Sequence, residues 1–310
     1  QLCDLAKNEI SILKTVPSFY NIQIAQSCTG KCTYCPYPKA FEEKYNSKVC
    51  DSTKVMPFSD FEIIIEKIAD FSEQAVIGLS AWGESLNNPE ILNFIKKVLS
   101  YEGLSVFLET DGLKVDEDFC KKLKEIVDNS VMRSNGWPKI MIVVSLDSFS
   151  SKEYGKLRGN ESLYEQAVSS VKMLSEILPE CVYPQFVRQK NNEDELENFY
   201  RYWNEKSNPS QGQLIIQKYN DFCQTLPDLK PADLSPLERN VCWHLRRDMT
   251  ILINGDVPLC YNHLFDNIKG NAITDPLQDI WKNFDEETIN HINKKYCDKC
   301  AKKRKHSKAT

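Results

Sequence analysis

The chain has 310 residues, which is enough for one large core or for a core with a small second domain. Hydrophobic residues make up 41% and charged residues 27%, an ordinary globular balance, and the net charge of −5 gives no indication of a nucleic-acid surface. No run of about 18 apolar residues indicates a membrane span and no signal peptide is visible, so we expect a cytoplasmic protein without membrane or nucleic-acid partners.

Short apolar runs alternate with segments of helical period from residue 21 to residue 218. Strands are predicted at 21–25, 75–80, 104–109, 139–146, 181–188 and 214–218, and helices at 59–71, 89–100, 116–128, 162–178 and 193–204. Ser59 and Glu62 form a capping-box pattern at the first helix, and Pro89 suits the first turn of the next. Six strands that alternate with helices indicate a parallel α/β sheet.

This alternation fits either an open doubly wound sheet or a barrel. Because only six units fit before residue 220, we predict a partial (β/α)6 TIM-like barrel rather than a full eight-unit one. In barrels the chemistry gathers on the loops after the carboxyl ends of the strands. The candidate residues lie at such ends, namely the cysteines 28–35, then 82–84, then 109–111, then Ser145 and Asp147.

We divide the chain into an N-terminal extension (1–20), the barrel (21–220), a proline-containing linker (221–240) and a C-terminal domain (241–310). In the last of these, Asn254-Gly255 between the apolar runs 248–253 and 257–260 predicts a β-hairpin. Helical segments are predicted at 276–283 and 286–294, and the basic run 302–306 is expected to be a solvated end.

Three cysteines, Cys28, Cys32 and Cys35, have the spacing Cys-x3-Cys-x2-Cys on the loop after the first predicted strand. Three thiolates on one tight loop can hold three corners of a 4Fe–4S cluster and leave the fourth iron open to a small molecule. A zinc knuckle is the alternative, but it needs a fourth ligand, and the first histidine in the chain is His244. Disulfides are a further alternative, typical of small secreted proteins rather than of a chain of this size.

A second group consists of Cys242, Cys260, Cys297 and Cys300, the last two with the spacing Cys-x2-Cys. Four thiolates can close either a 4Fe–4S cluster or a structural zinc site, and composition does not separate the two. The nearby histidines are interpreted as surface or core residues, because four cysteines already complete a site. The other five of the twelve cysteines are interpreted as small buried hydrophobic residues.

In these motifs the chain resembles the radical S-adenosylmethionine (radical SAM) superfamily. The resemblance starts at the cysteine loop, where Tyr34 precedes the last cysteine, and it continues in four further segments. Residues 81–86, 109–112, 145–148 and 157–159 resemble the family's Gly-Gly-Glu, Thr-Asn-Gly, Ser-Leu-Asp-Gly and Arg-Gly motifs, with Trp82 and Asp111 departing from the usual Gly and Asn. The stretch from Cys242 to Cys260 resembles the SPASM/Twitch extension, and the first strand is similar to that of spiro-SPASM proteins. No cysteine follows Cys300, which favours one auxiliary cluster.

The resemblance implies that the first cysteine group ligates a catalytic 4Fe–4S cluster and the second an auxiliary 4Fe–4S cluster. It implies SAM contacts for Tyr34, Gly83, Glu84, Ser145, Asp147 and Arg158. Glu84 with Gly83 would meet the amino group of SAM, Ser145 its ribose or methionyl part, and Arg158 its carboxylate. Alternative roles are a turn glycine for Gly83, a surface ion pair for Arg158 and a helix cap for Asp147. Gln185 and Arg188 are weaker candidates, because alternation along a strand lets only one of them face the barrel interior.

The function implied is that of a radical SAM enzyme of the oxidoreductase or maturase type. Reductive cleavage of SAM at the open iron would give a 5′-deoxyadenosyl radical that abstracts hydrogen from a substrate. We expect peptide or protein modification, with dehydrogenation of a sugar-like small molecule as the alternative. A non-catalytic iron–sulfur electron carrier or scaffold is the alternative from another class. The electron donor is expected to be of the flavodoxin or ferredoxin type, and the auxiliary cluster to transfer electrons or to stabilise the C-terminal domain.

Overall fold

The computed structural model describes residues 16–222, 225–232, 242 and 244–292, and for 285–292 only the backbone. Within these residues, seven strands form one parallel sheet in the order β6-β5-β4-β3-β2-β1-β7, and β8 pairs with β9 in a separate antiparallel ladder. The strands are β1 (Phe19–Ile22), β2 (Ala75–Gly78), β3 (Leu104–Thr110), β4 (Ile140–Ser145), β5 (Val182–Arg188), β6 (Ile215–Lys218), β7 (Asp248–Ile251), β8 (Asp256–Pro258) and β9 (Ile268–Asn271). The helices are α2 (Tyr37–Tyr45), α3 (Phe58–Ser72), α4 (Ile91–Val98), α5 (Glu117–Asn129), α6 (Ser151–Arg158), α7 (Tyr164–Ile177), α8 (Leu196–Asn204), α9 (His244–Arg247) and α10 (Leu277–Ile292), and the 3-10 turns are η1 (Val49–Asp51), η2 (Ser85–Asn87), η3 (Glu161–Leu163), η4 (Glu193–Glu195) and η5 (Tyr261–His263).

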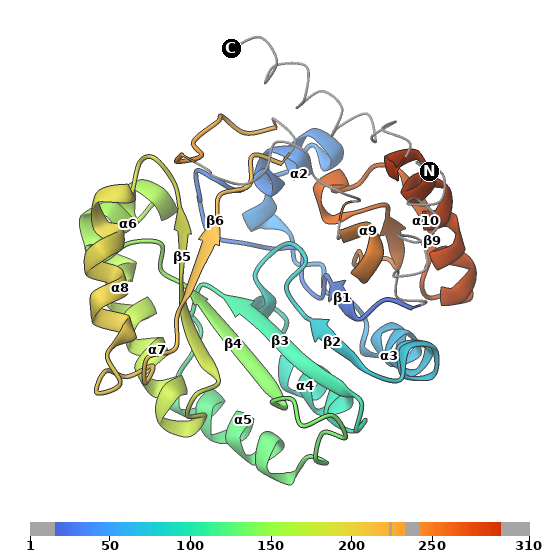
Figure 1. Cartoon of the computed structure of the whole chain (residues 1–310), viewed down its shortest axis with the longest axis horizontal. Helices are drawn as coiled ribbons and strands as arrows, with labels where there is room; N and C mark the ends of the chain where they lie inside the picture. The colour runs from blue at the N-terminus through green and yellow to red at the C-terminus, as the bar shows by residue number, and fades with distance from the viewer. Residues whose placement is uncertain (1–15, 223–224, 233–241, 243, 293–310) are drawn as a thin grey trace, which may run out of the picture.

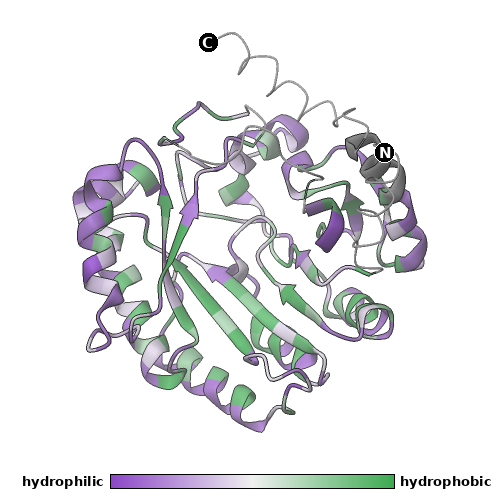
Figure 2. Ribbon diagram, in the orientation of Figure 1, coloured by the Kyte–Doolittle hydropathy of each residue, from purple (hydrophilic) through white to green (hydrophobic). Residues whose placement is uncertain are grey.

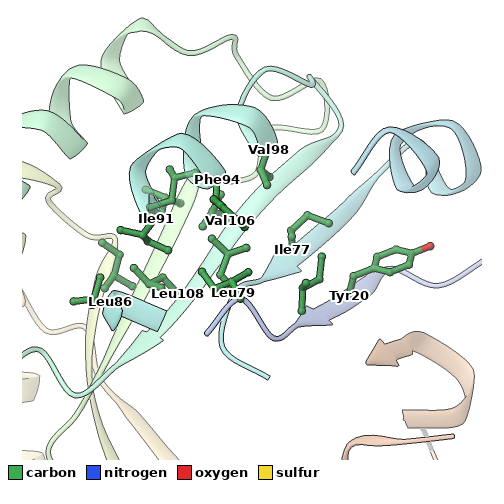
Figure 3. Close-up of a cluster of buried hydrophobic side chains, with 14 of the residues drawn as sticks. Tyr20, Ile77, Leu79, Leu86, Ile91, Phe94, Val98, Val106 and Leu108 are labelled. Atoms are coloured by element: carbon green, nitrogen blue, oxygen red, sulfur yellow. The ribbon is translucent and has the colours of Figure 1, made fainter. Parts of the chain in front are cut away.

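The sheet curls into a partial barrel, and the helices that connect its strands lie along its outer side (Figure 1). The main hydrophobic core fills the layer between the sheet and these helices. The ribbon in Figure 2 is accordingly mostly green along the strands, while the helices alternate between green and purple. Figure 3 shows one part of this layer, in which Phe94 and Val98 of α4 face Val106 of β3. The side of each helix that faces the sheet is therefore buried in the core, and functional side chains are expected on the inner side of the sheet.

The predicted partial (β/α)6 barrel is confirmed, with each of the six predicted strands and five predicted helices present within a few residues of its expected bounds. The run 248–253 was predicted as one strand of a hairpin, but its place as a seventh strand of the barrel sheet was not predicted. β7 pairs in parallel with β1, with Tyr20 opposite Met249, and so extends the sheet at its β1 edge. The sequence gives no sign of this pairing because the partners are more than two hundred residues apart.

The predicted hairpin at Asn254-Gly255 is wrong. The chain does turn there, since the amide of Gly255 donates to the carbonyl of Leu252 at 2.8 Å and Gly255 has a φ of +85°. However, β7 takes β1 as its ladder partner and β8 takes β9, so the two flanking runs belong to different sheets. The two helical segments predicted after it form the single helix α10.

Two helices near the cysteine loop, α2 and α6, were missed. α6 contains Gly155 and is mostly polar, so its pattern has little helical periodicity, although Ser150 caps it by accepting from the amide of Glu153. The predicted cap Ser59 is also wrong, because α3 begins one residue earlier and Pro57 occupies the cap position. No helix in the described part of the chain is both long and apolar enough to cross a membrane.

Candidate iron–sulfur and cofactor site

The cysteine loop follows β1 and docks on the carboxyl end of α6. The amide of Thr33 donates to the carbonyl of Leu157 at 2.9 Å, and the amide of Lys31 donates to the carbonyl of Arg158 at 3.4 Å. The last carbonyls of a helix have no partner within the helix, so the loop satisfies them. Gly159 ends α6 at a φ of +91°, and a Cβ on it would lie 2.8 Å from the Cβ of Lys31. The Arg-Gly pair is therefore the platform on which the loop rests.

Two of the three thiols lie beside Gly30, and Cys35 is close enough to interact electrostatically with both. A Cβ on Gly30 would lie 3.4 Å from the Sγ atoms of both Cys28 and Cys32, and the amide of Cys35 donates to the carbonyl of Cys32 at 3.2 Å. No set of three or more Cys, His, Asp or Glu side chains among the described residues converges closely enough to hold one metal ion. A multi-iron cluster takes one thiolate at each corner, so it does not need three thiols that converge on one ion, whereas a zinc site does.

The thiols lie in an environment that disfavours bare thiolates. Burial, and secondarily the neighbouring Cys32, raises the pKa of the Cys28 thiol to about 12. Burial also raises the pKa of Cys32 and of Cys35. Thiolates there require positive charge, which the iron of a cluster supplies when it is bound.

Tyr34, Asp147 and Arg158 form one buried hydrogen-bonded group. Arg158 donates from Nη1 to Asp147 Oδ2 at 2.8 Å and to the Tyr34 hydroxyl at 2.6 Å, and the Tyr34 hydroxyl donates to the same carboxylate oxygen. The other oxygen of Asp147 accepts from the amide of Val187 at 2.7 Å. Asp147 does not cap α6, so that alternative is wrong, and Arg158 is not in a surface ion pair because its side chain is 10% exposed.

Gly83 and Glu84 lie against the start of the cysteine loop. Gly83 has a φ of +85°, and a Cβ on it would lie 2.2 Å from the carbonyl oxygen of Ala25, so only glycine fits. The amide of Glu84 donates to the carbonyl of Ser27 at 2.8 Å. This arrangement fixes the direction of the Glu84 side chain relative to the thiols.

The Glu84 carboxylate is buried and accepts three hydrogen bonds. Its donors are the Thr110 hydroxyl at 2.6 Å, the amide of Asp111 at 2.9 Å and the amide of Leu86 at 3.1 Å. Burial and the Asp111 carboxylate nevertheless raise the pKa of Glu84 to about 7. A cation beside Glu84 would favour its ionised form.

Ser145 ends β4 on the inner side of the sheet, next to Gln185 of β5 and within hydrogen-bond reach of Glu109. Gln185 is buried and donates from Nε2 to Glu109 Oε1 at 3.2 Å. Arg188 lies on the opposite side of the strand and forms an ion pair with Glu193. Of the two weaker candidates, Gln185 is thus the one that faces the interior.

Aromatic side chains lie between the cysteine loop and the C-terminal segment and contact both. Trp82, which departs from the usual glycine, stacks on Tyr261 at a centroid distance of 4.0 Å and on Tyr37 at 5.6 Å. Cys28 and Cys35 pack against this cluster. Because Tyr261 directly follows Cys260, the stack joins the two cysteine-bearing parts of the chain.

Comparison with known families decides the identity. A model of the Radical SAM superfamily matches residues 22–202, more than half of the chain. The chain belongs to the radical SAM superfamily. A second model, SPASM, described as an iron–sulfur cluster-binding domain, matches residues 242–302 of this radical SAM protein. The resemblance drawn from the motifs is confirmed, and the cofactors are 4Fe–4S clusters and SAM.

Curated relatives of this radical SAM protein cover most of its length. An uncharacterized protein of Treponema pallidum (strain Nichols) is 35% identical over 285 residues, which cover 90% of this chain and 76% of that protein. An uncharacterized protein of Methanocaldococcus jannaschii is 24% identical over 242 residues, 71% of each chain.

Solved structures share the radical SAM fold at low identity. Streptococcus suis SuiB bound to precursor peptide SuiA has a TM-score of 0.65 at 16% identity, covering 89% of this chain and 67% of SuiB. The protein anSMEcpe with AdoMet and Cp18Cys peptide has 0.63 at 15%, covering 89% and 83%. BtrN with AdoMet and 2-DOIA has 0.53 at 14%, covering 89% and 87%.

The cysteines expected in the SPASM part of the radical SAM protein are only partly described. Cys242 and Cys260 are half-buried, whereas Cys297 and Cys300 lie outside the described residues. Six of the described cysteines are free thiols, namely Cys28, Cys32, Cys35, Cys50, Cys120 and Cys181. Among the remaining cysteines, Cys50 is exposed, which contradicts its interpretation as a buried hydrophobic residue.

Sequence reasoning missed three residues of the radical SAM site. Tyr37 and Tyr261 were not singled out, although aromatic residues flank both cysteine groups in the sequence. Gln217, which accepts from Gln185 Nε2 at 2.7 Å, was also missed. The alternation of side chains along a strand could have identified Gln217. It lies opposite Val187, which is two positions beyond Gln185, so it shares the inner face of the sheet with Gln185.

Proposed function

We propose that Cys28, Cys32 and Cys35 hold the catalytic 4Fe–4S cluster and leave one iron for SAM, in an enzyme that modifies a peptide or protein. The observation that carries this proposal is that the thiols of Cys28 and Cys32 lie beside Gly30, and Cys35 close to both, on a loop docked to the end of α6. When bound, the cluster and SAM supply reductive cleavage to a 5′-deoxyadenosyl radical that abstracts hydrogen.

The proposed role of Glu84 is to accept from the SAM ammonium. A carboxylate offers about four acceptor positions, and Glu84 uses three of them for Thr110, Asp111 and Leu86. One position therefore remains for an external donor, and an ammonium would offset the cost of burying the charge. Gly83 brings this carboxylate and the backbone close to the cysteine loop.

Tyr34 and Asp147 are proposed to hold the Arg158 side chain in place, and Arg158 is proposed to bind SAM. Asp147 and Tyr34 both bind Nη1 of Arg158, and Tyr154 makes a further hydrogen bond with Arg158, whereas a guanidinium has five donor hydrogens. The remaining donors of Arg158 are proposed to pair with the SAM carboxylate, for which a planar fork is suited. Ser145, at the end of the neighbouring strand, is proposed to contact the ribose or methionyl part.

The auxiliary 4Fe–4S cluster is proposed to use Cys242, Cys260, Cys297 and Cys300. Four thiolates leave no open iron, which favours electron transfer or stabilisation of the 241–310 domain over direct substrate ligation. A Cys297→Ala variant separates these two roles. Loss of turnover with undiminished cleavage of SAM and unchanged unfolding temperature supports electron transfer, whereas a lower unfolding temperature with retained turnover supports a stabilising role.

Peptide or protein modification is favoured because two of the similar structures, SuiB and anSMEcpe, were solved with peptides. Dehydrogenation of a sugar-like molecule is the second candidate, favoured by BtrN, which has AdoMet and 2-DOIA bound and 87% of whose length is covered by this chain. The reducing electron is proposed to come from a flavodoxin- or ferredoxin-type donor.

Anaerobic reconstitution tests the proposal against a non-catalytic carrier. Two four-iron clusters predict about eight irons per chain, and dithionite with SAM should then yield 5′-deoxyadenosine. Cys32→Ser should abolish the product and lower the iron content by about four, while the control Cys50→Ser, an exposed cysteine outside both groups, should change neither. A wild-type protein that holds eight irons but forms no 5′-deoxyadenosine would be a carrier.

A further inference from the structure

Four polar side chains on the inner face of the barrel, Glu109, Ser145, Gln185 and Gln217, form what we call the acceptor row. They come from the neighbouring strands β3, β4, β5 and β6, and Ser145 lies directly opposite Gln185. The alternate positions on the same strands, such as Phe186, pack against the outer helices, with Phe186 and Phe199 of α8 at 5.0 Å. Alternation therefore turns the acceptor row away from the helices.

The donor groups of Ser145 and Gln185 are used inside the acceptor row, and one buried acceptor is left over. Gln185 donates both hydrogen bonds of Nε2, to Glu109 at 3.2 Å and to Gln217 at 2.7 Å. The Ser145 hydroxyl donates a hydrogen bond to the Glu109 carboxylate. Gln185 is 3% exposed, yet its Oε1 has no hydrogen-bond partner among the residues that the structure describes. Reversing the amide does not solve this, because it would place Oε1 against the Glu109 carboxylate oxygen.

An unpartnered buried acceptor beside a carboxylate requires a donor from outside the chain. The Glu109 carboxylate adds acceptor positions, because two donors do not fill its two oxygens. The row opens to solvent at Gln217, which is exposed, so a ligand can reach it from the β6 side. A donor-rich ligand group would complete the hydrogen bonding that the protein leaves open.

The charges around Glu109 indicate the sign of that ligand group. Within the described part of the chain, the charged or ionisable groups that face Glu109 are Asp147, Arg158 and Tyr261. The single cation among them, Arg158, is held by Asp147 at 2.8 Å. Burial and Asp147 raise the pKa of Glu109 to about 7, which an added cation would reverse.

We propose that Glu109, Gln185 and Gln217 of the acceptor row form the substrate subsite of this enzyme, beside Ser145 at the cofactor, and that this subsite binds a protonated amine near the carbon that loses hydrogen. The inference rests on the proposed radical SAM function and adds the chemical class of the substrate. Two sources offer this chemistry, the side chain of a lysine in a peptide and the amino group of an amino sugar.

The test measures binding to the anaerobically reconstituted, SAM-saturated full chain by calorimetry. The probes are Nα-acetyl-lysine methylamide and glucosamine, each with a neutral match, Nα-acetyl-norleucine methylamide and glucose. At least one amine should bind about tenfold or more tightly than its neutral match, as expected for a charge-assisted hydrogen bond. Preference for the lysine probe identifies a peptide source, and preference for glucosamine identifies a sugar source.

Three variants assign the preference to the acceptor row. Glu109→Gln should remove the preference for the amine, and Gln185→Leu should weaken amine binding several-fold, while both keep the wild-type dissociation constant for SAM. The control Glu125→Gln alters an exposed residue of α5 and changes the net charge by the same amount as Glu109→Gln, so it should behave as wild type. Thermal unfolding shows whether each variant folds. If either Glu109→Gln or Gln185→Leu does not fold, the binding data of the other one test the proposal.

Equal binding of amines and neutral probes, or an unchanged preference in Glu109→Gln, overturns the proposal. Loss of SAM affinity in Glu109→Gln equal to its loss of amine affinity also overturns it, because the row would then belong to the cofactor site. The two proposals fail separately. A wild-type chain that prefers amines but makes no 5′-deoxyadenosine with dithionite contradicts the enzyme function alone, and the reverse result contradicts the subsite alone.

Discussion

Arg158 donates to Asp147 across 2.8 Å in a buried ion pair, although one residue ends α6 and the other follows β4. The same Arg158 reaches Tyr34 between the second and third cysteines, and its backbone carbonyl receives the loop amide of Lys31. One residue thus ties the cysteine loop to the carboxyl edge of the sheet. The position of the thiols depends on this pair as well as on the loop sequence.

Asp147→Asn should therefore both destabilise the protein and loosen the cysteine loop. Removing one partner of a buried pair leaves the other charge uncompensated, at a cost of roughly 3 kcal/mol or more. Urea unfolding of the apo protein measures this cost, and the alkylation rate of Cys32 measures the loosening. The control is Asp118→Asn, which breaks the exposed pair with Lys122 and should cost less than about 1 kcal/mol. Equal costs for the two variants would contradict a structural role of the Arg158–Asp147 pair.

Gly83→Ala should be far more damaging than an alanine at another left-handed glycine. Both Gly83 and Gly136 have a positive φ, +85° and +72°, so each alanine carries a backbone cost of about 1 kcal/mol. At Gly83 the new Cβ also lies 2.2 Å from a backbone carbonyl, whereas at Gly136 nothing lies within 4 Å. We expect Gly83→Ala to cost roughly 3 kcal/mol or more, with less iron incorporated on reconstitution. Chemical unfolding of both variants compares the two costs, and similar values would show that the close approach to Ala25 is relieved by movement.

Sequence patterns predict those parts of this protein whose interactions are local. The run 104–109 is predicted as a strand because it is mostly apolar, with apolar residues at alternate positions. The spacing of Cys28, Cys32 and Cys35 identifies the cysteine loop without any structural context. The order of the motifs along the chain then places them at successive strand ends, and the structure has them there. Local patterns were sufficient for the barrel and for the cysteine loop.

Contacts between distant residues could not be predicted in the same way. Tyr34 and Asp147 are 113 residues apart, and each reads separately as a cofactor contact until the curl of the sheet brings them together. The hydrogen bond of Gln185 to Glu109 depends on the register across β4, which one sequence does not fix. β7 looks like a hairpin strand because its turn is local, while its true partner β1 is not.

Trp82→Ala should destabilise the contact between the cysteine loop and the C-terminal segment. Trp82 is 5% exposed and stacks on both Tyr37 and Tyr261, so truncation leaves a cavity and costs roughly 3–5 kcal/mol. Trp82→Phe keeps an aromatic ring and should recover part of the loss. The control Trp137→Ala removes the same side chain from a surface position that is 48% exposed and should stay within about 0.5 kcal/mol of wild type. Thermal unfolding of the apo proteins provides the comparison, and a tolerated Trp82→Ala would show that the stack is dispensable.

Glu109→Gln should change how the stability of the apo protein depends on pH. Burial and Asp147 raise the pKa of Glu109 from its ordinary 4.5 to about 7, so the folded state holds its proton where the unfolded state has lost it. The wild type therefore has the full contribution of this group below pH 4.5 and loses it as the pH rises through 7. Glutamine has no proton to lose, so the stability of the variant relative to wild type should rise by up to about 3 kcal/mol over that interval. Urea unfolding at pH steps between 4.5 and 8 measures the difference, and Glu125→Gln provides the surface control. Parallel pH profiles for Glu109→Gln and wild type would mean that the Glu109 carboxylate is already compensated in the absence of substrate.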